Sequence, residues 1–167
     1  MVTTMDDDRC RSPEKPPSAG RVLESAFRIL ARRDHTCKEL SVKLRGKGFG
    51  HTAVRQTLVR CRELGYLDDA RTAGVMAEHL VARGYGPRRV RQTLLQKGLD
   101  ESLVLKALTR CGDEESQVRK ARRMLAKKTA RLERESDAWK RRRVAYRYLA
   151  GRGFTSEVID RAIKADL

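Results

Sequence analysis

Residues 83–100 read RGYGPRRVRQTLLQKGLD, and this stretch decides the fold. The Gly-Pro pair at positions 86–87 is typical of a helix start, because proline at the first helical position gives up no hydrogen bond that the helix needs. Val90 and Leu94 follow one turn apart on a single helix face. Gly98 is placed to end the helix, and a capping aspartate follows it. The stretch therefore predicts a helix, a glycine turn and a second helix.

The same turn recurs along the chain. Gly48, Gly98 and Gly153 align at spacings of 50 and 55 residues. A basic residue precedes each glycine and a large apolar residue follows it, and apolar positions match on both sides at helical spacing. We expect these matched side chains to be buried: Leu40, Leu44, Val54, Leu58, Val90, Leu94, Val104, Leu108, Leu149, Ile159 and Ile163.

The repeat predicts an all-α fold of three tandem three-helix repeats, with nine helices in an elongated, curved array. One such unit has a marginal core, so neighbouring units gain by sharing buried surface. The expected boundaries are a disordered tail over 1–20 and repeats over 21–66, 67–112 and 113–167. The tail is proline-rich, and the alternation typical of strands is absent from the sequence.

Charge points to a polyanionic partner. The chain has 38 Lys and Arg against 22 Asp and Glu, a net charge of +16 and a pI of about 10.4. The surplus is +7 over 21–66, +3 over 67–112 and +7 over 113–167. A basic surface that runs through every unit suits a long contact with nucleic acid or with an acidic protein surface. The alternative is that each basic cluster only solvates its helix.

Several classes of protein are disfavoured. Nucleophile-elbow, P-loop and dinucleotide-binding motifs are absent from the sequence, so we expect neither a catalytic site nor a cofactor. The cysteines at 10, 37, 61 and 111 are scattered, which fits no metal site and indicates a reducing cytoplasm. Cys61 and Cys111 are predicted to be small core residues. The sequence contains neither a signal peptide nor a membrane span, so we expect a cytoplasmic protein.

Two pairs of residues invite a choice between a structural and a functional role. Asp68 and Asp69 could be metal-binding carboxylates, but they precede a predicted helix, where capping and the helix dipole favour acidic residues. Trp139 and Tyr146, seven residues apart, are interpreted as core residues rather than as a platform for stacking bases.

Two segments resemble the RecX family, the bacterial regulators of the RecA recombinase. They are ELGYLDDARTA at 63–73 and RGYGPRRVRQTLLQKGL at 83–99. The family pattern has G-Y-L-D-D and then G-x-G-P-x-R-[IV]-R-x-x-L-x-x-K-G-[IVL]. The resemblance covers 21–167 and is looser in the third unit; Thr72 stands where the family tends to have an aromatic residue.

The resemblance implies a function that composition alone does not. It implies a monomer that binds RecA filaments on single-stranded DNA, lies in their helical groove and inhibits recombinase, ATPase and co-protease activity in the damage response. We expect the contact to include Arg88, Arg89 and Arg91, with the repeated basic position at each turn and two clusters of the third unit. These further residues are Lys47, Lys97, Arg152, Arg122, Arg123, Arg141 and Arg142.

Two other functions stay open at this point. In the first, the protein binds DNA or RNA without RecA, using the middle and third helices of each unit as helix-turn-helix pairs, with Arg88 to Arg91 in a groove. In the second, it is an enzyme such as a nuclease, which would need a carboxylate cluster that the sequence does not show.

Overall fold

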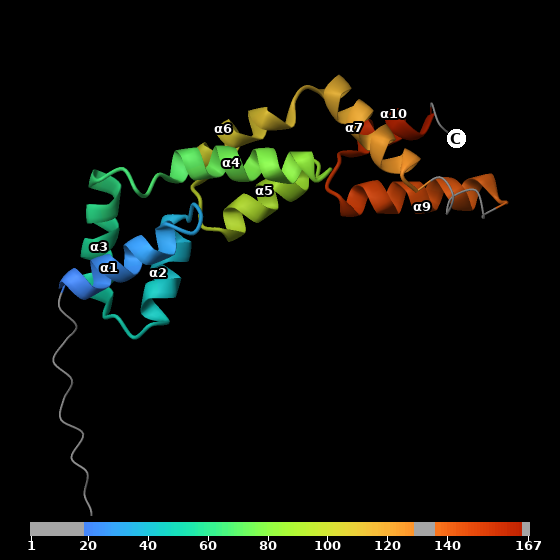
Figure 1. Ribbon diagram of the computed structural model, residues 1–167. Helices are drawn as coiled ribbons and strands as arrows, with labels where there is room; N and C mark the ends of the chain where they lie inside the picture. Colours follow the sequence, from blue (N-terminus) through green and yellow to red (C-terminus); the bar gives the residue numbers. More distant parts are fainter. Residues whose placement is uncertain (1–18, 129–135, 165–167) are drawn as a thin grey trace, which may run out of the picture.

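The computed structural model describes residues 19–128 and 136–164. These residues form nine α-helices and one short 3-10 helix, and they contain no strand. The helices follow one another in an elongated, bent array (Figure 1). In chain order they are α1 (Ala19–Leu30), α2 (Cys37–Arg45), α3 (His51–Glu63), α4 (Asp69–Ala82), α5 (Pro87–Gln96), α6 (Glu101–Leu108), η1 (Thr109–Cys111), α7 (Glu114–Ala126), α9 (Ala138–Gly151) and α10 (Ser156–Lys164).

Helices pack in threes, as the repeat predicts. Helices α1 to α3 surround one hydrophobic cluster, α4 to α6 with η1 a second, and α7, α9 and α10 a third. Leu67 belongs to the first cluster, so that core reaches one residue past the expected boundary. Helix α1 already begins at Ala19, and the rest of the expected tail lies outside the described residues.

The aligned glycines share one conformation. Gly48, Gly98 and Gly153 have φ angles of 84°, 79° and 86°, in the left-handed region that side chains other than hydrogen disfavour. In each turn the residue after the glycine returns its amide to the preceding helix, for example Phe49 to the Leu44 carbonyl at 3.4 Å. The repeated glycine is therefore required by the turn itself.

Most of the predicted core is confirmed. Nine of the eleven side chains expected inside are buried. Leu58 and Leu108 are only half-buried, and this part of the expectation is wrong. In the third helix of the first two units the smaller neighbours Thr57 and Ala107 are buried instead, whereas in the third unit the aligned Ile163 is itself buried. Cys61 in α3 and Cys111 in η1 are buried, as predicted.

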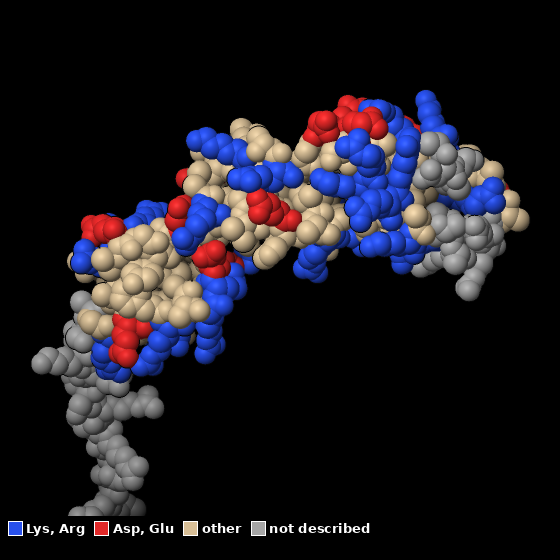
Figure 2. All heavy atoms as spheres, turned by 45° about the horizontal axis from the view of Figure 1, so that its top comes forward, with Lys and Arg blue, Asp and Glu red and all other residues tan. Residues whose placement is uncertain are grey.

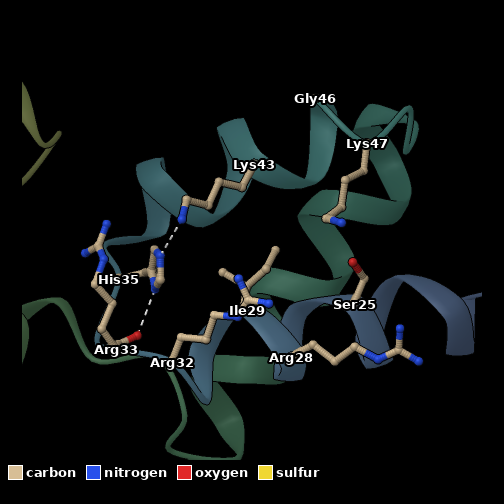
Figure 3. A pocket seen from close by; sticks show the side chains of 9 residues that line it. All are labelled: Ser25, Arg28, Ile29, Arg32, Arg33, His35, Lys43, Gly46 and Lys47. Atoms are coloured by element: carbon tan, nitrogen blue, oxygen red, sulfur yellow. Dashed lines mark hydrogen bonds between the residues drawn. The ribbon is translucent and has the colours of Figure 1, made fainter.

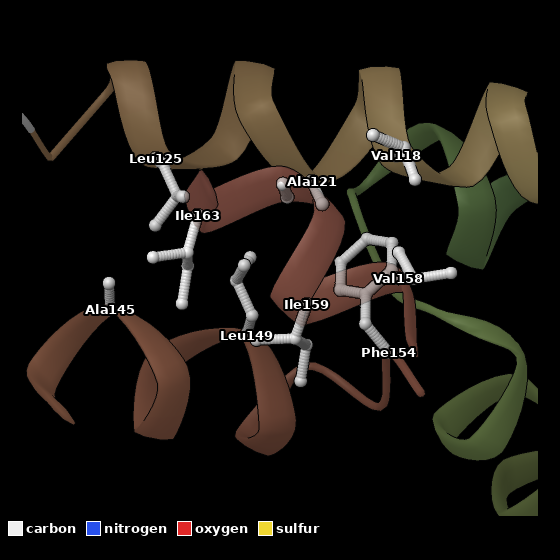
Figure 4. Close-up of a cluster of buried hydrophobic side chains, with 10 residues drawn as sticks. Val118, Ala121, Leu125, Ala145, Leu149, Phe154, Val158, Ile159 and Ile163 are labelled. Carbon is white, nitrogen blue, oxygen red and sulfur yellow. The ribbon is translucent and has the colours of Figure 1, made fainter. Parts of the chain in front are cut away.

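Among the described residues, the core cluster of the third unit contains more buried residues than either of the other two (Figure 4). Phe154, which follows the glycine turn, fills it beside Leu149 and Ile159. Trp139 and Tyr146 lie outside it, with 64% and 39% of their surfaces exposed, so their interpretation as core residues is wrong. The inward face of α9 is formed instead by Ala145 and Leu149, and the indole of Trp139 lies under the Arg143 guanidinium at 5.0 Å.

Helix starts follow the local sequence. Thr36 forms a capping box with Glu39, and Asp68 accepts hydrogen bonds from the amides of Ala70 and Arg71. Capping is thus the observed role of Asp68. Within the described residues, no group of His, Cys, Asp and Glu is arranged to hold a metal ion. None of the described helices has the length and apolar character that crossing a membrane requires.

Candidate functional site

The first and second units meet where the turn of one unit reaches the start of the middle helix of the other. The Thr36 hydroxyl donates to the Lys97 carbonyl at 2.7 Å. The Lys97 ammonium in turn donates to the Glu39 carboxylate at 2.6 Å. Nearby, the Cys37 amide donates to the Asp69 carboxylate at 2.9 Å. The turn residue Lys97 therefore ties the second unit to the first.

The Glu39 carboxylate is the negative charge that two cations bind at this junction. Burial raises the pKa of its carboxyl, but hydrogen bonds from two cations and a backbone amide outweigh burial and lower the pKa to about 2. The cations are Lys97 and Arg33, the latter at 3.2 Å. Glu39 is therefore a carboxylate at every physiological pH, and its partners are not free cations.

The second and third units meet in the same way: the glycine turn of the third unit contacts the start of α5, the middle helix of the second unit. The Gly86 amide donates to the Arg152 carbonyl at 2.9 Å, and the Arg88 amide donates to the Gly153 carbonyl at 3.0 Å. The approach is so close that a Cβ atom on Gly153 would lie 2.4 Å from the Arg89 amide nitrogen. The glycine turn of the third unit is thus packed against the first turn of α5.

Arg152 completes this second junction. Its guanidinium donates to the Arg83 carbonyl at 2.8 Å and lies over the rings of Tyr85 and Tyr148, at 5.4 and 5.2 Å from their centroids. A guanidinium over aromatic faces adds a cation–π attraction to the hydrogen bond. Arg152 and Lys97 hold equivalent places, so the repeated basic position holds the units together wherever a preceding unit exists.

Lys47, the first member of that series, belongs to the first unit of the described array, so no described unit precedes it. Its side chain is exposed and lines a hollow between α1 and α2. Of the three repeated cations expected in the contact, only Lys47 is therefore free of a junction.

The arginines of α5 divide into two kinds. Val90 is buried, and the side chains of Arg88 and Arg89 are exposed on the opposite side. Arg89 donates to the Gln92 side chain at 3.3 Å, but neither arginine forms an ion pair among the described residues. Arg91 instead binds the Glu101 carboxylate at 2.7 Å. Among the described residues, Arg88 and Arg89 thus have no carboxylate within ion-pair distance, whereas Arg91 is neutralised by Glu101. Hydrogen bonds at the start of α10 lower the pKa of the Glu157 carboxyl, and the positive charge of Arg88 adds to this effect.

The basic clusters of the third unit lie on α7 and α9, where Figure 2 shows Lys and Arg gathered on the surface. Arg123 is exposed, whereas Arg122 is half-buried and reaches the Arg161 carbonyl at 3.4 Å. Arg142 is exposed and lies 3.9 Å from the Asp160 carboxylate, and Arg141 is half-buried. These four residues extend the basic surface into the third unit.

Sequence reasoning missed one group of basic residues. Arg28, Arg32, Arg33 and Lys43 meet Lys47 around the hollow in the first unit. They are spread over twenty positions, on α1, on α2 and in the segments that follow these two helices, so no short motif marks them. The only available signal was the surplus of charge in that unit.

Comparisons with known proteins agree over nearly the whole described array. The family descriptions "RecX, first three-helix domain", "RecX, second three-helix domain" and "RecX, third three-helix domain" match residues 23–61, 68–108 and 114–163. The chain is 33% identical over 145 residues to a Legionella pneumophila protein named "Regulatory protein RecX", covering 86% of this chain and 93% of that protein. A protein of the same name from Escherichia coli K12 is 36% identical over 110 residues, 60% of this chain and 66% of the relative.

Solved structures show the same fold. The crystal structure of RecX from Lactobacillus salivarius superposes with a TM-score of 0.78 at 20% identity, covering 88% of this chain and 95% of that one. A second crystal structure, of "regulatory protein RecX", gives a TM-score of 0.80 at 24% identity, covering 89% and 72% of the two chains. The expected fold, three tandem three-helix repeats, is confirmed.

Proposed function

This chain belongs to the RecX family of regulatory proteins, and we propose that it binds RecA filaments on single-stranded DNA and restrains their recombinase, ATPase and co-protease activity. In this proposal it acts in the cytoplasm, as a monomer, during DNA repair and the response to DNA damage. The regulatory role follows from the family.

The observation that carries the proposal concerns two arginines on α5. Among the described residues, neither Arg88 nor Arg89 has a carboxylate within ion-pair distance. Arg88 and Arg89 are exposed in the middle of a bent array, on a helix whose opposite face is buried. Solubility does not require two adjacent guanidinium groups without an ion pair. Planar guanidinium groups bind carboxylates and phosphates in the same bidentate manner, so they suit a partner that presents acidic protein and DNA together.

Because the array is elongated, its basic surface extends over all three units. Exposed basic residues continue from Lys47 in the first unit to Arg123 and Arg142 in the third. A linear array can follow the groove of a helical filament and contact several subunits at once, which raises affinity without a deep pocket. Occupying that groove would hinder the subunit movements and strand access on which the filament's activities depend.

The alternative, direct insertion of helix-turn-helix pairs into a DNA groove, has less support. In such motifs the second helix of the pair enters the major groove and the first crosses the backbone. Helix α6 would therefore be the recognition helix, and its cap Asp100 and first residue Glu101 carry negative charges that repel phosphate. Here the first turn of α5 is covered, because its amides at Gly86 and Arg88 are bonded to the turn of the third unit. The exposed side chains of Arg88 and Arg89 can contact phosphate, but groove insertion by this end of α5 is obstructed.

Co-sedimentation tests the proposal. We expect the protein to pellet with RecA when single-stranded DNA and a non-hydrolysed nucleotide are both present, and to stay in the supernatant with RecA alone. Pelleting that depends on DNA alone, with no contribution from RecA, would contradict the proposal and favour the direct nucleic-acid reading.

A further inference from the structure

A hollow of about 650 Å³ opens between α1 and α2 of the first unit (Figure 3). Six nitrogen-bearing side chains line it: Arg28, Arg32, Arg33, His35, Lys43 and Lys47. No Asp or Glu side chain among the described residues takes part in the lining. The chain thus gathers five cations around one concave space, at a cost in mutual repulsion that an anion would relieve.

Only part of this charge is compensated by acidic partners. Arg28 pairs with Glu24, and Arg33 pairs with Glu39. Within the part of the chain that the structure describes, Arg32 and Lys47 have neither an ion pair nor a side-chain hydrogen bond. Two cations on facing walls are therefore available to a ligand.

His35 sets the position of a third cation. The ring is buried, and its Nδ1 lies 2.8 Å from the Arg33 carbonyl oxygen, which can only accept, so Nδ1 donates. Nε2 therefore accepts from the Lys43 ammonium at 2.9 Å. Burial, the largest cause, lowers the pKa of His35, which keeps the ring neutral near pH 7 and able to hold Lys43. A buried imidazole thus orients a surface ammonium at the rim of the hollow.

The hollow continues along α1 into a second one, which shares Ser25, Arg28 and Lys47 with it and adds Arg21, Glu24 and Phe49. Glu24 is the one acidic side chain that lines this second hollow, and Arg28 pairs with it. We call the two together the first-unit trough. Its two ends on α1 at Arg21 and Arg28 lie about 10 Å apart along the helix axis, roughly the length of three stacked nucleotides. The half-buried ring of Phe49 gives the trough one aromatic surface beside its cations.

The trough has no counterpart in the second unit. The positions aligned with Arg32, His35 and Lys43 hold Ala82, Tyr85 and Thr93 there. Tyr85 is moreover covered by the Arg152 guanidinium of the third unit. The charged lining is therefore a property of the first unit and not of the repeat.

We propose that the first-unit trough is a binding site for the phosphate groups of single-stranded nucleic acid. Arg32, Lys43 and Lys47 contact successive phosphates, and Phe49 offers a face on which a base stacks. An open trough suits a polymer that enters and leaves at its ends, and contacts to phosphate with one stacking ring give little preference for sequence. The inference deepens the proposed function, on which it rests for its biological setting, by giving the array a DNA contact away from α5.

Fluorescence anisotropy with a short labelled oligothymidylate, without RecA, tests the site. The variant is Arg32→Gln with Lys47→Gln, because neither side chain has a described partner whose loss would disturb the fold. We expect affinity to fall about tenfold at physiological salt, and the log–log salt slope to become shallower by about 1.4, the contribution of two phosphate contacts on a single strand.

The matched control is Arg45→Gln with Arg55→Gln. Both side chains are exposed in the same unit, neither lines the trough, and the net charge changes equally. The control should bind within about twofold of the unaltered protein. Equal losses in both variants, or no loss in the trough variant, would overturn the proposal, and circular dichroism shows that both variants are folded.

Competition identifies the ligand. ATP at the same total phosphate concentration should not release the oligonucleotide; release would overturn the proposal in favour of a mononucleotide site. Polyglutamate binding that is lost in the trough variant, while oligonucleotide binding is kept, would overturn it in favour of an acidic protein. Co-sedimentation with RecA separates the two proposals, since the oligonucleotide assay contains no RecA and stands or falls without it.

Discussion

Replacing Glu39 by glutamine should weaken the junction of the first two units and alter its pH dependence. A carboxyl group whose pKa falls from 4.5 to about 2 on folding binds protons less well in the folded state than in the unfolded state. At neutral pH this stabilises the fold by up to about 3 kcal/mol, since a tenfold change in proton affinity corresponds to about 1.4 kcal/mol. The stability is present above pH 4.5 and is lost as the pH falls toward 2.

Urea denaturation at pH 7 and at pH 3 measures this contribution. Glu39→Gln keeps the shape and an acceptor for the Thr36 amide but removes the charge that Lys97 contacts at 2.6 Å. We expect a loss of about 1–3 kcal/mol at pH 7 and a smaller difference at pH 3. The control, Glu63→Gln, removes an exposed partner of Arg60 and should cost less than about 1 kcal/mol. An unaltered pH dependence in Glu39→Gln would refute the reasoning.

Three further outcomes follow from the structure. Leu94→Ala should cost about 2–5 kcal/mol in chemical denaturation, because the side chain is fully buried; a loss under 1 kcal/mol would contradict that packing. Gly153→Ala should lower the melting temperature more than Gly48→Ala. Both glycines have a positive φ, but only at Gly153 would the new Cβ meet the backbone of Arg89, at 2.4 Å. Equal effects would contradict this close packing of the second and third units. Binding to any DNA-containing partner should weaken with salt at a log–log slope of about −0.7 per phosphate contact on a single strand, and a flat titration would exclude the basic surface.

Local rules explain what could be predicted from sequence. A positive φ at the end of a helix selects glycine whatever lies nearby, so Gly48, Gly98 and Gly153 revealed the repeat, and with it the all-α array. Apolar spacing likewise placed Val90 and Leu94 inside. The prediction for Leu58 was wrong because Thr57 and Leu58 are adjacent on the same helix and only Thr57 is buried. Periodicity alone does not say which of two adjacent positions faces the core.

The candidate site depends on contacts that local rules do not contain. Lys97 and Arg152 resemble Lys47 in sequence, yet they hold junctions because a preceding unit supplies Glu39 and the Tyr85 ring. The packing of the units therefore decides whether a basic residue binds a neighbouring unit or stays available to an external partner. The turn of the third unit binds the Arg88 amide and packs against the backbone and Cβ of Arg89, yet both arginines stay exposed.

Inhibition of the DNA-dependent ATPase activity of RecA tests the central claim most directly. The variant Arg88→Glu with Arg89→Glu reverses the unpaired charges of α5, and Arg9→Glu with Arg11→Glu makes the same change in net charge outside the described array. We predict that the α5 variant keeps its melting temperature but loses inhibition, while the control inhibits as the unaltered protein does. Equal loss of inhibition in both, or full inhibition by the α5 variant, would contradict the claim that this helix forms the filament contact.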